Sequence, residues 1–300
     1  MENRKFIKFS IFPIGLIIFI IPLFSFAYSD TTTHPALTDE IVDLFNYNYS
    51  SLKISDLEKE LIKKGSTNED IPPRWMQHFY DPVYNRGLVL VKEWEKSKDW
   101  AKDTLAQAKY DPVFAASLGT ITRKLFSSKT DYSWDRAVYE YVWGDKQKGL
   151  EALGHTLHLL EDATVPEHTR NDVHLPFFDW GSPYENWTSQ FNDKNFQLAE
   201  NLIKENKKPI IFSNLNQYFN DNAIYSNNNF FSKDTILDNK YTMPVPMGGE
   251  KKIDGMIFIS TVDNNKRNIL LARKYKVLNP ITLEFTDSYS IKDDKFLVLT

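Results

Sequence analysis

The 300-residue chain contains no cysteine. This absence excludes disulfide bonds, zinc sites built from thiolates and a lipobox lipid anchor, so any zinc must be held by His, Asp and Glu. The chain also lacks an excess of positive charge, because its formal net charge is −4. Such mild acidity argues against a non-specific polyanion binder, which needs a basic face, and we expect no stable nucleic-acid complex.

The first 27 residues have the pattern of an export signal. Basic residues at positions 4, 5 and 8 precede an apolar run over 9–26, and Ser25-Phe26-Ala27 has the small-x-small form of a cleavage site. We therefore predict a signal peptide over 1–27 and a secreted or extracytoplasmic protein. The alternative is an uncleaved membrane anchor, because the apolar run approaches the ~18–20 residues that span a bilayer.

The rest of the chain lacks internal repeats and low-complexity linkers, which favours a single domain over residues 28–300. We predict a mainly α fold, with a multi-helix core over 33–206 and a mixed C-terminal portion over 207–300. Helical periodicity and capping signals predict helices at 38–47, 55–64 with Gly65 as the stop, within 86–107 and 111–127, 133–143, 146–163 and 184–206.

The C-terminal portion contains a strand signal. Residues 253–262 and 268–277 predict a small β-hairpin around a polar turn at 263–266. From Asp287 to Thr300 an apolar run begins without a capping signal, which we interpret as a final helix cut short; a frayed terminus is the alternative.

Histidine is scarce, with six in the chain, and four of the six lie between residues 150 and 174. His158 and Asp162 are four residues apart on a predicted helix, so they share one face, roughly 40° apart. Pro166 ends that helix after Val165, and His168 follows. Burying such polar groups without partners is costly, and a metal would compensate. The alternative is a buried helix with hydrogen-bonded histidines and a capping acid.

Other residues with the same ligand chemistry lie upstream. His34 follows the predicted leader, and His78 follows the acidic pair Glu69-Asp70. Imidazole and carboxylate without thiolate suit catalytic zinc better than closed structural zinc. His155, three residues before His158, is interpreted as a supporting or structural residue.

These residues resemble the zinc-dependent phospholipase C family, within the phospholipase C/S1-P1 nuclease superfamily. The matching elements are Thr33-His34, Asp70 before His78-Phe79-Tyr80-Asp81-Pro82, and H-x3-D-x5-H formed by His158, Asp162 and His168. The resemblance covers about 33 to 190 and implies a helical fold that holds two or three zinc ions.

The resemblance also implies ligand sets. One zinc would take Asp70, His78, His158 and Asp162; the second would take His168 with His174 and Glu185; the third would take His34, Asp162 and the mature N-terminus. The family has its last His and Glu four apart, whereas His174 and Glu185 are further apart, and Asp179 is the alternative ligand. Tyr28 would replace the family's N-terminal Trp, and Glu69 could replace Asp70.

The implied activity is hydrolysis of phospholipid headgroups by an exported phosphodiesterase, with Asp70 orienting or deprotonating the attacking water. We expect a phospholipid or other phosphodiester substrate, peripheral membrane contact and a monomer. Aromatic residues in 175–187 (Phe177, Phe178, Trp180 and Trp187) would contact lipid or choline, or else pack in the core. The alternatives are an S1/P1-type single-strand nuclease and a non-catalytic, zinc-stabilised surface protein.

Overall fold

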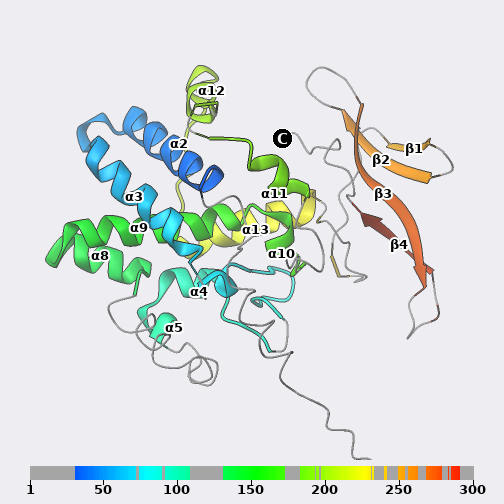
Figure 1. The fold of residues 1–300 in the computed structure, drawn as a ribbon, viewed down its shortest axis with the longest axis horizontal. Helices are drawn as coiled ribbons and strands as arrows, with labels where there is room; N and C mark the ends of the chain where they lie inside the picture. Colours follow the sequence, from blue (N-terminus) through cyan, green and yellow to red (C-terminus); the bar gives the residue numbers. More distant parts are fainter. Residues whose placement is uncertain are drawn as a thin grey trace, which may run out of the picture.

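The protein is mainly helical in its computed structural model (Figure 1). The structure describes residues 31–71, 74–89, 92–108, 131–172, 183–192, 194–195, 197–230, 232, 240–241, 249–253, 256–262, 268–278, 283 and 285–290. The predicted leader and the predicted helix within 111–127 lie outside these residues. The helices are α2 (Thr33–Asn48), η2 (Ser50–Leu52), α3 (Asp56–Glu69), η3 (Arg74–Gln77), α4 (Ser97–Lys102), α5 (Thr104–Ala108), α8 (Trp134–Trp143), α9 (Lys146–Asp162), α10 (Pro166–Thr169), α11 (Pro183–Thr188), α12 (Leu198–Lys204) and α13 (Leu215–Asn229).

The helices α3 and α9 cross at very short distance. A Cβ atom on Gly65 would lie 1.9 Å from the carbonyl oxygen of Glu151, and one on Gly154 would lie 1.9 Å from that of Ile62. The two glycines therefore let the helix backbones touch. The prediction that Gly65 ends its helix was wrong, because α3 continues to Glu69 and uses this glycine for close approach.

The helices α8 and α9 form an antiparallel pair whose ends follow the predicted signals (Figure 1). The Ser133 hydroxyl accepts from the Arg136 amide at the start of α8, and Gly144 caps its end. Asp145 caps α9 by accepting from the amides of Gln147 and Lys148. The predicted helices 133–143 and 146–163 are therefore confirmed.

Two apolar clusters fix α9 in the bundle. On one side Leu159 packs with Trp100 of α4 and Phe219 of α13, all buried. On the other side Leu150 packs with Val42 of α2 and Ile62 of α3. The C-terminal end of α9, which carries His158 and Asp162, is therefore buried in the protein.

Other predicted helices differ from the structure. The helix predicted at 38–47 begins earlier, at Thr33. Within 86–107, helix forms only from Ser97 onward. The helix predicted over 184–206 is two short helices, α11 and α12, and α13 lies in a segment whose weak periodicity predicted none. These segments gain their helical structure from tertiary packing more than from local pattern.

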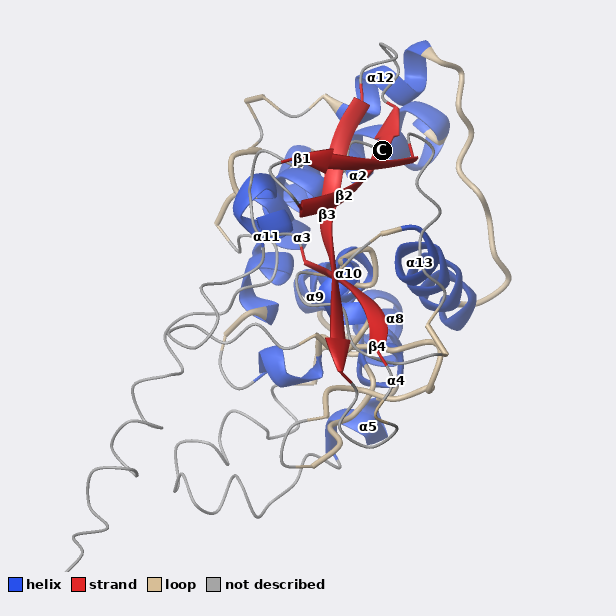
Figure 2. Cartoon of the chain, turned by 90° about the vertical axis from the view of Figure 1, so that its right-hand side faces the viewer, coloured by secondary structure: helices blue, strands red, loops and turns tan. Residues whose placement is uncertain are grey.

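The C-terminal portion contains a four-stranded antiparallel sheet in the order β1-β2-β3-β4, on one side of the helices (Figures 1 and 2). The strands are β1 (Gly249–Ile253), β2 (Met256–Val262), β3 (Asn268–Leu278) and β4 (Phe285–Ser290). The predicted hairpin forms the central pair, in which Ile257 faces Lys274. Beyond Asp287 the chain continues as strand through Ser290, which corrects the predicted final helix at that point.

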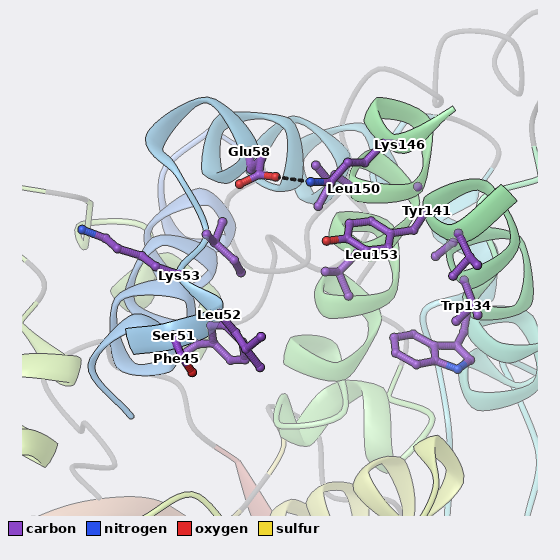
Figure 3. Close-up of a pocket in the computed structure, with 15 residues that line it drawn as sticks. Phe45, Ser51, Leu52, Lys53, Glu58, Trp134, Tyr141, Lys146, Leu150 and Leu153 are labelled. Carbon is purple, nitrogen blue, oxygen red and sulfur yellow. Dashed lines mark hydrogen bonds and ion pairs between the residues drawn. The ribbon is translucent and has the colours of Figure 1, made fainter. Parts of the chain in front are cut away.

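An apolar cavity of about 550 Å³ lies between η2, the end of α2, α8 and α9 (Figure 3). Leu52, Trp134 and Leu153 line it, and an ion pair of 2.6 Å joins Glu58 to Lys146 at its edge. None of the predicted site residues lines this cavity. Within the described part of the chain, every helix is too short or too polar to cross a lipid bilayer.

Candidate metal centre

The end of α9 and the chain after it carry the central motif. His158 and Asp162 lie one turn apart on α9, and both are fully buried. Val165 is extended and precedes Pro166 at the first position of α10, so the chain changes direction there. This turn brings His168 back to Asp162, with its Nδ1 atom 3.3 Å from Oδ1 of Asp162.

Each oxygen of Asp162 faces two imidazoles. Oδ1 lies 3.6 Å from Nε2 of His34 and 3.3 Å from Nδ1 of His168. Oδ2 lies 2.9 Å from Nδ1 of His78 and 3.4 Å from Nε2 of His158. The carboxylate therefore separates the cluster into two halves, His34 with His168 and His78 with His158, although His34 also stacks on His158.

Asp70 belongs to the half that contains His78 and His158. As the residue that caps α3, it places Oδ1 3.5 Å from Nδ1 of His78 and 3.7 Å from Nε2 of His158. Two sets of side chains have ligand atoms within 4.8 Å of one another: His34 with Asp70 and His158, and His78 with His158 and Asp162. Both sets are buried and are close enough together to hold an ion.

Glu69 occupies a different place from Asp70. Its carboxylate accepts hydrogen bonds from Arg74 at 2.7 Å and from the Trp100 indole at 2.9 Å. His155 Nδ1 lies 2.5 Å from its Oε2. Because these partners surround Glu69, the structure favours Asp70 over Glu69 as the acid of the cluster. His155 contacts Glu69, and the supporting or structural role predicted for it stays a prediction.

The start of α2 supplies His34. Thr33 donates from its hydroxyl to the Thr188 carbonyl at 2.7 Å, which ties α2 to the end of α11. His34 is fully buried and stacks on His158 with ring centroids 3.6 Å apart. Its Nδ1 atom lies 2.6 Å from Oε2 of Glu161, while Nε2 faces Asp162.

The orientation of His158 is fixed from the opposite side by α3. Its Nδ1 donates to the backbone carbonyl of Ser66 at 2.7 Å. A carbonyl can only accept, so Nδ1 carries the proton and Nε2 presents its lone pair to the cluster when the ring is neutral. The close crossing at Gly65 places this carbonyl within reach of the ring.

The polar atoms at the centre do not satisfy one another. Among the described residues, both oxygens of Asp162, both ring nitrogens of His78 and Nε2 of His158 are buried and lack a hydrogen bond of acceptable geometry. They nevertheless lie 2.9 to 3.4 Å apart. Buried polar atoms that converge without bonding are costly unless a further group binds them, and a divalent cation fits this donor set.

The pKa values in the cluster reflect the same crowding of buried polar groups. Burial lowers the pKa of His158, but Asp70 and Asp162 outweigh it and raise the pKa to about 10. Burial raises the pKa of Asp162, but the imidazoles of His168, His78 and His158 hold it well below its ordinary value. Burial and His158 lower the pKa of His34 well below its ordinary value. Positive charge is therefore favoured at the centre, where a proton on His158 and a bound cation would compete.

Glu185 of α11 lies on the outer side of His168, with Oε1 3.6 Å from Nε2 of that ring. Glu185 is buried and keeps its place as a candidate ligand. His174 and Asp179 lie outside the described residues, as do Phe177, Phe178 and Trp180. The remaining predicted ligands all converge on one buried volume: His34, Asp70, His78, His158, Asp162, His168 and Glu185.

No family model and no curated protein matches the sequence. Among solved structures, the chain is similar to alpha toxin from Clostridium absonum, with 15% identity and a TM-score of 0.33. That match covers 68% of this chain and 53% of the toxin chain, so the chain spans about half the length of that structure. So distant a likeness assigns no activity, and the chemistry of the site rests on its own residues.

Sequence reasoning missed Glu161 and the carbonyl of Ser66, which support the candidate ligands. The sequence holds one signal for Glu161: it is an acidic residue directly before Asp162, at the end of an otherwise apolar run. A backbone carbonyl carries no sequence signal, so its contact with His158 is visible only in the structure.

Proposed function

We propose that the protein is an exported, zinc-dependent phosphodiesterase that hydrolyses phospholipid headgroups, in the manner of a phospholipase C. The observation that carries the proposal is Asp162, a buried carboxylate with two imidazole nitrogens facing each of its oxygens. S1/P1 nucleases share the H-x3-D-x5-H motif, so the choice of substrate is supported by the resemblance of residues 78–82 (His-Phe-Tyr-Asp-Pro) to the phospholipase branch.

Three groups of ligands follow from the arrangement and the resemblance. His78, His158 and Asp70 would hold one zinc on the Oδ2 side of Asp162. His168 and Glu185 would hold a second, and His34 would hold a third on the Oδ1 side. Bound zinc supplies a water that is acidic enough to be hydroxide near neutral pH.

The chain's own residues would do the remaining work. Asp162 holds the two halves of the cluster together, and Ser66 keeps the Nε2 atom of His158 directed inward. Asp70 Oδ2 is buried beside the cluster, where a carboxylate could orient or deprotonate an attacking water. The burial of the cluster excludes bulk water, which strengthens these electrostatic interactions.

The test is a comparison of two substrates with protein of measured zinc content. We expect diacylglycerol release from phosphatidylcholine vesicles, its loss on chelation and its return with zinc. His158→Ala should abolish release while the far-UV circular dichroism is retained, because it removes a ligand from the half that contains Asp70. Lys64→Ala, at an exposed position on α3, is the matched control and should keep full activity.

The outcomes separate the alternatives. Release of nucleotides from single-stranded DNA without diacylglycerol release would replace the proposal with an S1/P1-type nuclease. One tightly held zinc with no hydrolysis of either substrate, and unfolding of His158→Ala, would replace it with a zinc-stabilised surface protein. Wild-type protein that binds no zinc would contradict both the proposal and these alternatives.

A further inference from the structure

The carboxylate of Glu161 lies outside every ligand set that the motif implies, yet it is 5% exposed and directed at the cluster. Glu161 and Asp162 are neighbours on α9 but face different partners. Asp162 faces the imidazole nitrogens at the centre, whereas Glu161 Oε2 lies 2.6 Å from Nδ1 of His34. One turn of α9 therefore contributes a candidate ligand and a contact to a ligand on another helix.

Thr38 completes this arrangement from α2. Its hydroxyl donates to Oε1 of Glu161 at 3.1 Å, and it is fully buried. Thr38 lies one helical turn after His34, so both residues reach Glu161 from the same face of α2. Each oxygen of Glu161 therefore has one partner on α2: Oε1 contacts Thr38, and Oε2 contacts His34.

We propose that Glu161 is a positioning residue that fixes the tautomer and the orientation of His34 as a metal ligand. A neutral imidazole has one proton, and a ring that offers Nε2 to a cation must carry that proton on Nδ1. The proton then needs an acceptor, and Glu161 Oε2 is the atom in contact with Nδ1. Loss of the carboxylate from a carboxylate–histidine–metal arrangement typically weakens metal affinity by a factor of about 10 to 100.

The inference rests on the proposed metal centre, because it concerns the support of one of its ligands. The substitution Glu161→Gln tests whether this residue acts through its carboxylate or only fills space. The glutamine amide has nearly the same shape but no charge. Its NH2 group can donate to Nδ1 and move the ring proton to Nε2, and its carbonyl oxygen accepts from Nδ1 more weakly than a carboxylate, so either orientation of the amide weakens metal binding. An ionised carboxylate can only accept, so Glu161 in its charged form excludes that tautomer.

The experiment measures zinc affinity and zinc per chain by competition with a chromophoric chelator. We expect Glu161→Gln to bind one zinc, the ion that His34 would hold, about 10- to 100-fold less tightly than wild type. Glu151→Gln removes a carboxylate from the surface of the same helix and is the matched control, with unchanged affinity. Thr38→Val should weaken binding in the same direction by a smaller factor, because it releases only Oε1.

A double variant distinguishes positioning from a structural role. If Glu161 acts through His34, then Glu161→Gln should change zinc affinity no further in a His34→Ala background. An equal further loss in that background would overturn the proposal, as would wild-type affinity in Glu161→Gln. Should Glu161→Gln fail to fold, wild-type affinity in a folded Thr38→Val would overturn it. Wild-type protein without any zinc would instead contradict the proposed function itself.

Discussion

At the scale of single residues, Asp162 is the side chain on which the cluster converges. A fully buried carboxylate is expensive unless it is paired, and Asp162 lies within 3.6 Å of four imidazoles that come from separate parts of the chain. The two halves of the cluster therefore share one side chain, and its loss should affect both.

Asp162→Asn tests this sharing. The amide keeps the shape of the side chain but turns one acceptor oxygen into a donor, which repels a cation and loses the bridging charge. We expect zinc per chain, measured by mass spectrometry after dialysis, to fall by more than one ion. The amide should leave the far-UV circular dichroism of the helices unchanged.

His155→Phe is the control for this prediction. His155 lies on the same helix but contacts Glu69 and stacks on Tyr132, with ring centroids 4.1 Å apart. Its loss should cost about 1–3 kcal/mol of unfolding free energy and leave zinc binding unchanged. Equal zinc loss in both variants would contradict the division between cluster and support.

The motif identified His158, Asp162 and His168 correctly as neighbours, because their spacing along one helix and one turn fixes their separation. The contact of Glu161 was not predicted, because its partner is a histidine 127 residues earlier in the chain.

At the scale of elements, the crossing of α3 and α9 positions the candidate site. Gly65 and Gly154 bring the helices together, and this contact places the Ser66 carbonyl on His158 and the end of α3 beside the cluster. A glycine in a helix interior is normally destabilising relative to alanine. Here the two helices pack so closely that both positions require a residue without a Cβ atom.

Gly154→Ala should therefore destabilise the protein although alanine is the better helix former. The added Cβ would lie 1.9 Å from the Ile62 carbonyl oxygen and 2.8 Å from the Ser66 amide, so the helices must separate. We expect a loss of about 1–3 kcal/mol in chemical denaturation. Zinc affinity should fall as well, because Ser66 moves away from His158.

Gln147→Ala provides the comparison, since this position lies near the start of the same helix and is exposed. That substitution should change stability by only a few tenths of a kcal/mol. A Gly154→Ala variant more stable than wild type would show that the backbones are not in contact.

At the scale of the whole molecule, the candidate ligands come from segments that only the folded state brings together. α2 supplies His34, α9 supplies Asp162 and α11 supplies Glu185. An unfolded chain offers no such site, so zinc should bind the native state and stabilise it.

The melting temperature should therefore rise with zinc and fall with a chelator. At a free zinc concentration about 100 times the dissociation constant, the gain is about 2.7 kcal/mol for one site. Differential scanning calorimetry measures it. The zinc-dependent increment should grow as pH rises from about 6 to about 8, because metal binding releases imidazole protons.

The sign of this pH effect follows from His158. Without metal its pKa is raised to about 10, so zinc must displace a proton, and affinity increases with pH. A melting temperature that does not change with zinc would contradict a site built from these imidazoles. A zinc-dependent increment in melting temperature that decreases as pH rises would contradict it as well. Calcium at the same concentration is the control, because it prefers oxygen ligands.

The sequence by itself determined the mainly helical fold, the ends of α8 and α9, the central strand pair and the residues to suspect as ligands. The elements follow from local periodicity and capping residues, which act within a few residues along the chain, whereas the candidate ligands came from ligand chemistry and the resemblance to a known family. The tertiary structure alone decided that Asp70 faces the cluster while Glu69 faces Arg74, that Gly65 serves a helix crossing, and that Glu161 holds His34. Each of those depends on which surfaces pack together, and such contacts join residues too distant in sequence for a local pattern to record.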